Sequence, residues 1–293
     1  MCCSANAQQV ATYAQYMFNG LAINPAYAGS HEVLSATALV RFQNVGLDGA
    51  PKTQTFSLHS PLLNKRVGLG VLAIRDEIGV ITQTGLQFSY AYRIPLSEKV
   101  TLSMGLQGGI GIYDANYTEL ELPPTPTPDP AFQYDVHETR PNIGAGLYLY
   151  SANYYVGLSA PHLVNNAFDR GENFETVYQN KPILLTAGYI FPIHRLLKLK
   201  PNFLLKVVDD RPVEFDLNAN LLFDEVLWAG ISYKSTKTVS LILQAQLTDQ
   251  IQFGYSYQVA AGPIRVVELG SHEVMVNYRF KYNKKNIVSP RYF

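Results

Sequence analysis

A chain of 293 residues with 23 basic and 23 acidic side chains has no net charge, which excludes the basic field that attracts nucleic acids. Its hydrophobic residues make up 47% of the total, yet no stretch approaches the roughly 18–20 consecutive apolar residues of a membrane helix. Cys2 and Cys3 are the only cysteines, so the body of the chain has no disulfide and no cysteine metal site.

The first nine residues contain a pattern typical of a signal-peptidase site. The tripeptide Ala5-Asn6-Ala7 is small-x-small, so cleavage is expected after its second alanine. Residues 1–7 are interpreted as a residual signal peptide, although the charged region and the apolar core of a leader do not precede the site. Two alternatives stay open: a short tail with chance alanines, and a lipid anchor on either cysteine, which lacks an upstream apolar box.

Beyond residue 30, large apolar side chains alternate with small or polar ones. In Thr101–Ile112 the large residues fall on one face and the small or polar ones on the other, and the same pattern recurs at 85–94 and 251–259. Successive side chains of a strand point to opposite faces, so one face is expected to meet lipid. This pattern predicts a transmembrane β-barrel, and the 20 Tyr and 14 Phe suit its aromatic girdles. A large soluble β-sandwich, also Tyr-rich, is the alternative.

Residues 31–293 are interpreted as one all-β domain, a transmembrane antiparallel barrel with a C-terminal tail. About fourteen strands are predicted, an even number, as bacterial single-chain barrels require. They are 31–42, 52–60, 66–75, 81–94, 100–113, 140–150, 152–160, 183–191, 196–208, 213–222, 226–233, 239–247, 251–260 and 273–281.

The connections between these strands alternate in length. The short ones are 61–65, 95–99, Ser151, 192–195, 223–225 and 248–250. The ones between them include the much longer 43–51, 114–139, 161–182 and 261–272. Membrane barrels have tight periplasmic turns on one side and long external loops on the other, whereas a sandwich has no reason to keep this alternation. The barrel is therefore favoured, with both termini expected on the periplasmic side.

The segment Leu122–Pro130 has five prolines in nine residues. Proline cannot pair inside a sheet and favours an extended polyproline conformation. The segment is therefore expected to project as a semi-rigid external arm, which either contacts a partner or is simply a solvated loop.

The run Gly68–Ala73 matches the G-x-G-x-x-A form of a dinucleotide-binding turn. That chemistry needs a helix to begin immediately after the glycines, whereas here the alternation continues into Ile74. Gly68 and Gly70 are therefore predicted to be strand glycines that face a crowded lumen.

Two Ser-His-Glu tripeptides, at Ser30–Glu32 and Ser271–Glu273, invite a metal or acid–base interpretation. The first opens the first predicted strand and the second opens the last. With an even strand count these two openings lie at opposite ends of the barrel, so one shared site is excluded. Each tripeptide is interpreted as a hydrogen-bonded strand start.

The sequence does not gather a catalytic set. The other histidines, 59, 137, 162 and 194, are scattered, and no G-x-S-x-G, H-E-x-x-H or P-loop motif occurs. We expect no enzyme activity, no cofactor and no metal. Charged residues in the strands are expected to pair across the lumen, with a selective pore lining as the alternative; they are Arg41, Arg75, Arg93, Lys206, Glu214, Asp216, Glu273 and Arg279.

Two N-terminal segments, Gln15–Asn19 and Ala22–Ser30, resemble the signature of the PorP/SprF family. These are outer-membrane proteins of the type IX secretion and gliding apparatus of Bacteroidetes. The most specific part of the resemblance comprises Asn24, Pro25, Ala26, Tyr27 and Gly29. The resemblance extends to Gly270–Glu273 and to Ser289–Phe293 at the C-terminus, whereas the external loops match nothing.

The resemblance implies a bacterial outer-membrane barrel that does no chemistry. Members of the family are associated with secretion and surface retention of adhesins and other cargo that carry a C-terminal sorting domain. Some also contact periplasmic, peptidoglycan-linked components of the same machinery. The implied partners are thus secreted cargo, those periplasmic components and outer-membrane lipid, and not nucleic acid.

Residues 8–30 precede the strands and are predicted to form an N-terminal periplasmic lid or plug. Proline forces an extended or turn geometry at Asn24, and Gly29 permits a tight reversal. Residues 21–29 are therefore expected to fold under or into the periplasmic mouth of the barrel. Tyr27 is predicted to be buried against the barrel wall with its hydroxyl hydrogen-bonded, as buried tyrosines usually are.

The loops 114–139 and 161–182 are expected to form the docking surface for a sorting domain, because aromatic side chains concentrate binding energy at interfaces. The alternative is that these aromatics pack the loops together or sit in the headgroup girdle. The candidate aromatic anchors are Tyr113, Tyr117, Phe132, Tyr134, Phe168, Phe174 and Tyr178.

Two rival functions come from other classes. A passive porin or hydrophobic-solute transporter would use the same barrel with an open lumen. A barrel-embedded hydrolase would need Ser, His and Asp or Asn clustered near one rim, which the sequence does not visibly provide.

Overall fold

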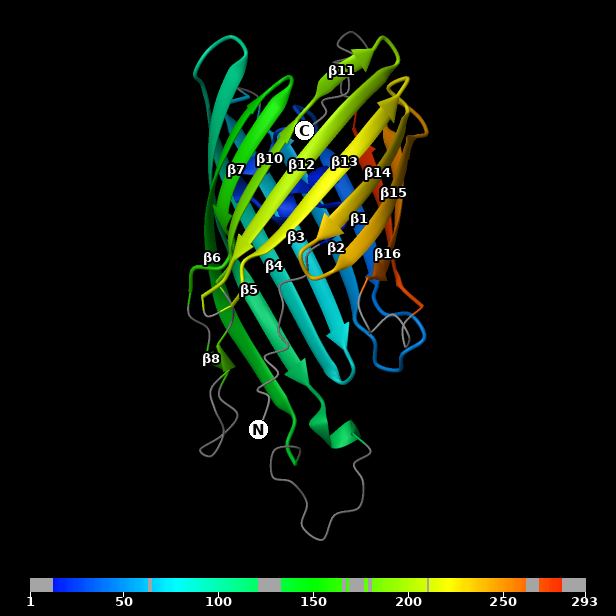
Figure 1. Ribbon diagram of the computed structural model, residues 1–293. Helices are drawn as coiled ribbons and strands as arrows, with labels where there is room; N and C mark the ends of the chain where they lie inside the picture. The colour runs from blue at the N-terminus through cyan, green and yellow to red at the C-terminus, as the bar shows by residue number, and fades with distance from the viewer. Residues whose placement is uncertain are drawn as a thin grey trace.

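The chain folds into a closed antiparallel β-barrel of fourteen strands with one additional strand on its sheet (Figure 1). The computed structural model describes residues 13–62, 65–120, 133–164, 167–168, 177–178, 181–209, 211–261 and 269–280, with the backbone alone at 167–168 and 177–178. No helix in these ranges is long and apolar enough to cross a membrane.

The barrel strands follow one another as antiparallel neighbours. They are β1 (Ser35–Phe42), β2 (Lys52–Pro61), β3 (Val67–Ile78), β4 (Ile81–Pro95), β5 (Val100–Ala115), β6 (Val136–Ser151), β7 (Tyr154–Ala160), β10 (Ile183–Tyr189), β12 (Leu197–Val207), β13 (Glu214–Phe223), β14 (Leu227–Lys234), β15 (Thr238–Gln246), β16 (Ile251–Ala260) and β17 (Ser271–Arg279). β10 lies between β7 and β12, and β1 pairs with β17 to close the barrel. The prediction of a fourteen-stranded antiparallel barrel is confirmed.

Three short strands lie outside this pattern. β11 (Phe191–His194) continues from β10 and pairs with β12, while β8 (Ala167–Phe168) and β9 (Val177–Tyr178) form a separate pair. The sequence prediction missed β11 because Pro192 cannot donate a hydrogen bond within a sheet and therefore indicates a turn. Pro192 lies where the β11 register shifts.

The hairpin of β5 and β6 is longer than predicted. β6 begins at Val136 rather than at residue 140, and all its added residues pair with β5. Polar residues occupy both faces there: His137 bonds Asp114, and Arg140 pairs with Glu138 at 3.0 Å. Apolar alternation therefore disappears although the strand continues, which is why the sequence pattern ended too early.

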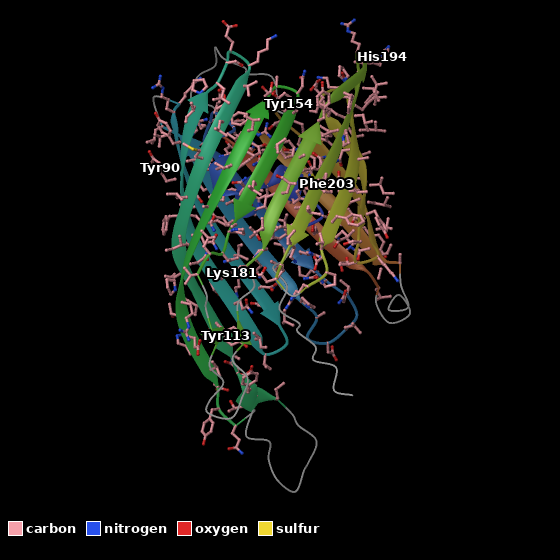
Figure 2. The ribbon with its side chains drawn as sticks, turned by 60° about the vertical axis from the view of Figure 1, so that its left-hand side comes forward. Tyr90, Tyr113, Tyr154, Lys181, His194 and Phe203 are labelled. Carbon is pink, nitrogen blue, oxygen red and sulfur yellow. The ribbon has the colours of Figure 1, made fainter. Side chains whose placement is uncertain are left out.

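The two faces of the wall differ as the alternation predicts. On β4 and β5 the large side chains of Phe88, Tyr90 and Leu106 are exposed on the outside, whereas Ser103 and Gln107 are buried inside. Figure 2 shows Tyr90 on the outside of the wall. The outer face is thus apolar enough to meet lipid, and the inner face is lined largely by small and polar residues.

Tight turns gather at one end of the barrel, named here the short-turn end, and the long connections lie at the other, the long-connection end. Figure 2 shows Tyr154 and His194 toward the first end and Tyr113 toward the second. The long-connection end also has two tight turns, between β3 and β4 and between β14 and β15. Only the short-turn end is therefore uniform.

Leu106→Arg should weaken the barrel strongly. Leu106 is 63% exposed halfway along β5, and an arginine at the midplane of the lipid face costs about 2–4 kcal/mol. We expect that loss of unfolding free energy in urea titrations of the lipid-folded protein. Leu120→Arg, beyond the end of β5, is the control and should change little; an equal loss would contradict a lipid-facing Leu106.

Candidate functional site

The most distinctive site is the interior of the barrel, which residues 13–30 occupy. This segment, named here the plug, contains three short 3-10 helices, η1 (Tyr16–Phe18), η2 (Gly20–Ala22) and η3 (Pro25–Tyr27). Nearly all its residues are buried, and Figure 1 shows it in dark blue inside the wall. It runs from the long-connection half of the lumen, beside Thr55, to the short-turn end, where Gly29 meets Gly68.

A single carboxylate binds the start of the plug. The oxygens of Glu273 on β17 accept the backbone N–H of Ala14 at 2.8 and 2.9 Å and that of Gln15 at 3.2 Å. The Ser256 hydroxyl donates to the same carboxylate at 3.3 Å. Glu273 is fully buried, and Arg41 lies directly opposite it across the β1–β17 junction. The plug is thus fastened to the junction of the first and last strands.

Side chains of the plug bind the wall on both sides of this junction. The Tyr13 hydroxyl lies 2.5 Å from that of Thr55 on β2, and Gln244 on β15 donates to Gln15 at 3.0 Å. Burial raises the pKa of Tyr13 to about 12, so its hydroxyl stays protonated and can donate. The Ser57 hydroxyl donates to Asn19 at 2.8 Å.

Apolar and aromatic side chains of the plug also contact the wall. Phe18 meets the chain's single tryptophan, Trp228, edge to face with ring centroids 5.7 Å apart. The ammonium of Lys200 lies 5.1 Å from the Phe18 ring and 5.6 Å from the Trp228 ring. Met17 joins a buried cluster that includes Leu39 and other wall residues. Trp228 therefore reports spectroscopically on the position of the plug.

The motif residue Asn24 organises the last turn of the plug. Its side-chain oxygen accepts the backbone N–H of Ala26 at 2.9 Å and caps η3, in which Pro25 is the first residue. Its amide nitrogen donates to the carbonyl of Leu147 at 2.9 Å. The Ser103 hydroxyl donates to the carbonyl of Ala26 at 2.7 Å. The motif is thus both a helix cap and a contact with the wall.

Tyr27 is buried, and its hydroxyl lies 2.9 Å from Nε2 of His31, so the prediction of a buried, hydrogen-bonded tyrosine is confirmed. Burial raises its pKa, which keeps the hydroxyl protonated. Gly29 follows with a φ of 75°, where glycine is favoured. Its N–H donates to Nδ1 of His59 at 3.1 Å, and its carbonyl accepts from Arg93 at 2.6 Å.

Glycines in the wall mark where the backbone of the plug approaches. A Cβ on Gly68 would collide with Ala28, one on Gly105 with Pro25 and Ala26, and one on Gly146 with Asn24. The prediction that Gly68 and Gly70 are strand glycines facing a crowded lumen is confirmed, since Gly70 meets Leu21 of the plug. The crowding comes from the plug, because Ala28 lies against Gly68 and Leu21 against Gly70.

The candidate docking aromatics at the long-connection end lie in different surroundings. Tyr113 and Tyr117 are buried, with their hydroxyls 3.3 Å apart, whereas Tyr134 is 76% exposed. Asp135 holds the base of this loop by accepting from the backbone and hydroxyl of Thr118. The other candidates lie outside the described side chains, as does the Pro-rich arm; they are Phe132, Phe168, Phe174 and Tyr178.

The two His-Glu pairs lie at opposite ends of the barrel, as predicted, because His31 is near the short-turn end and His272 begins β17. The interpretation as strand starts is wrong for the first pair, since β1 begins only at Ser35. It also missed that Glu273 binds the plug. No group of three or more possible metal-ligating side chains gathers in the described residues.

Charges in the lumen are paired only in part. Lys206 lies 3.2 Å from Glu214, and Lys234 lies 3.9 Å from Asp216. These two ion pairs agree with the expectation that charged side chains of the lumen pair with one another. Arg75 contradicts the prediction, because its exposed side chain pairs with Glu77 of the same strand. Its position on β3 points outward, where the alternation of the strand places it.

Sequence comparison identifies the family of this chain. The profile of the type IX secretion system membrane protein PorP/SprF matches residues 5–278. The chain belongs to the PorP/SprF family. The motif from Asn24 to Gly29 is the most specific part of the resemblance to this family, and the same motif forms the last turn of the plug. A search of curated proteins finds no match.

Solved structures with the same fold are bacterial barrels. A CymD monoaromatic hydrocarbon channel is 14% identical with a TM-score of 0.52, covering 92% of this chain and 94% of that one. A Pseudomonas aeruginosa FadL homologue is 13% identical with a TM-score of 0.52, covering 91% and 94%. Omp33 of Acinetobacter baumannii is 9% identical with a TM-score of 0.50, covering 85% and 98%. Fold and family together place this PorP/SprF protein in the outer membrane.

Glu273→Gln should destabilise the protein by about 2 kcal/mol, because hydrogen bonds to a charged acceptor contribute roughly 1.5–3 kcal/mol and the amide opposes the N–H groups of Ala14 and Gln15. Urea unfolding measures this loss. Glu77→Gln, which removes only partly exposed ion pairs, is the control and should cost under about 1 kcal/mol. Equal losses would show that the carboxylate does not hold the plug.

Gly105→Val should displace the plug while the barrel stays closed, because the new side chain would occupy the position of Pro25 and Ala26. We expect new conductance in planar bilayers and a red shift of Trp228 emission as Phe18 moves away. Gly108→Val, in the same strand but facing open space, is the matched control. Unchanged conductance and emission in both variants would contradict a fixed plug at Gly105.

Proposed function

We propose that this barrel is a non-enzymatic part of the type IX secretion and gliding machinery. It aids the secretion or surface retention of cargo that carries a C-terminal sorting domain. Membership of the PorP/SprF family supports the machinery. The absence of a gathered catalytic set from the sequence supports a role in binding rather than chemistry.

The filled lumen is the observation that favours binding over transport. Residues 13–30 cross the interior, and the wall satisfies their backbone through Glu273, Ser103 and Ser159. A solute would have to displace these contacts to pass. Cargo is therefore recognised on an outer surface and not conducted through the barrel.

The rim at the long-connection end is the surface that suits cargo. The β5–β6 hairpin extends there, its base packs around Tyr113 and Tyr117, and Tyr134 is exposed. A rigid support with an exposed aromatic residue is typical of binding hot spots. The Pro-rich arm lies between the two strands of this hairpin in the sequence and belongs to the proposed surface.

The short-turn end is proposed to face the periplasm, which puts the end of β17 on that side; the plug itself begins with Tyr13 in the long-connection half of the lumen, so the start of β1 does not place the N-terminus. β1 starts there and β17 ends there, and tight turns are typical of the periplasmic side of such barrels. This end would then contact the peptidoglycan-linked components of the machinery, while the apolar outer face contacts outer-membrane lipid.

A passive porin or hydrophobic-solute transporter is the alternative function. One structure of similar fold is described as a monoaromatic hydrocarbon channel, but similarity at 14% identity supports the fold alone. The inner wall here is rich in Ser, Thr, Asn and Gln, which does not suit an apolar solute. Continuous conductance of the unmodified protein would favour the alternative.

Replacing Leu122–Pro130 with a Gly/Ser loop, or Tyr134 with alanine, should leave the barrel folded and reduce surface retention of cargo at least severalfold. The physical reason is the loss of aromatic contact area at the rim. Quantitative surface labelling of cargo on whole cells measures the effect. Tyr189→Ala, exposed near the opposite end, is the matched control. Loss of retention in the control alone would move the binding surface to the short-turn end.

A further inference from the structure

Two arginines near the short-turn end of the lumen form no ion pair within the described residues. These are Arg93 on β4 and Arg279 on β17, neither of which takes part in any of the ion pairs observed. Glu32, which follows the plug in sequence, pairs instead with Lys65 at 3.7 Å. Buried cations in proteins are normally paired. Arg93 is buried and Arg279 is partly buried, so an anion between them would supply the missing partner.

Arg93 presents a specific recognition edge. Its Nη1 donates to the carbonyl of Gly29 at 2.6 Å, which fixes the orientation of the guanidinium. Its Nε and Nη2 are buried and have no hydrogen-bond partner in the described structure. These two N–H groups share one edge of the guanidinium, which is the edge that donates two parallel bonds to a carboxylate or a phosphate.

Arg279 is positioned by its own strand. Its Nε donates to the side-chain oxygen of Asn277 at 3.2 Å. The amide nitrogen of Asn277 in turn donates to Ser35 at 2.9 Å and to Thr37 at 2.8 Å, which orients that oxygen. Arg279 lies opposite Ser35, and Ser35 lies opposite His59, across the neighbouring strands β17, β1 and β2. His59 accepts the N–H of Gly29, the same residue whose carbonyl binds Arg93. The two cations therefore flank one small part of the lumen.

We propose that Arg93 and Arg279 bind a small oxyanion, a carboxylate or a phosphate, that fastens the end of the plug. The chemistry of the paired N–H edge selects an anion with two or more oxygens over chloride. Arg93 is only 4% exposed, so the occupant is a small free ion and not a group on a macromolecule. Its negative charge would hold the arginine that binds Gly29, and with it the plug.

The test uses the purified full chain in detergent micelles with sodium phosphate, sodium acetate or sodium chloride at equal ionic strength. Thermal unfolding is followed by Trp228 fluorescence and by gel mobility of the folded barrel. Phosphate or acetate should raise the midpoint temperature saturably, whereas chloride should not. Comparing phosphate with acetate identifies the preferred oxyanion.

The variants separate the site from general salt effects. Arg93→Gln should raise the half-saturating anion concentration at least tenfold, and Arg93→Lys should do the same because it keeps the charge but loses the paired N–H edge. Arg75→Gln, which removes an exposed arginine, should keep the unmodified response. If Arg93→Gln does not fold, Arg279→Gln decides. An equal response to chloride, or a saturable response unchanged in the Arg93 and Arg279 variants, would overturn the site.

Discussion

The volume enclosed by fourteen strands is the constraint on which this structure depends. Barrels of about eight strands can fill their interior with wall side chains, whereas those of about 16–18 enclose an aqueous channel. Fourteen strands leave a space too wide for their own side chains, and this chain fills it with its N-terminal segment. Small residues of the inner wall, such as Gly68 and Gly105, leave the space that the backbone of this segment occupies.

Polar contacts dominate how the segment is held. A backbone inside a barrel must replace the hydrogen bonds it made with water. Glu273 supplies acceptors for Ala14 and Gln15, while wall hydroxyls such as those of Ser103 and Ser159 supply donors for plug carbonyls. The polar side chains of the inner wall thus bind the backbone of the plug. A polar lumen therefore does not by itself indicate a conducting pore.

The strands could be predicted from the sequence because alternation is a local property. It failed where both faces are polar, as at His137 and Asp114 on the extended hairpin, and where Pro192 interrupts β11. The site could be predicted only in its local part: Tyr27 was expected to be buried and bonded, as it is. The bond between Ala14 and Glu273 joins residues 259 positions apart, and no local pattern encodes such a contact. The partners expected at the rim stay a prediction.

The short distance along the chain between the plug and β1 limits how the interior can ever open. Only residues 30–34 separate Gly29 from the start of β1 at Ser35, and five extended residues span at most about 18 Å. Ser35 is itself held by β2 and β17. The plug can therefore leave the lumen only at the short-turn end, where β1 begins. After leaving, it would stay close to that end because it is covalently attached to β1. Opening of the lumen would be reversible, because the attached plug cannot diffuse away.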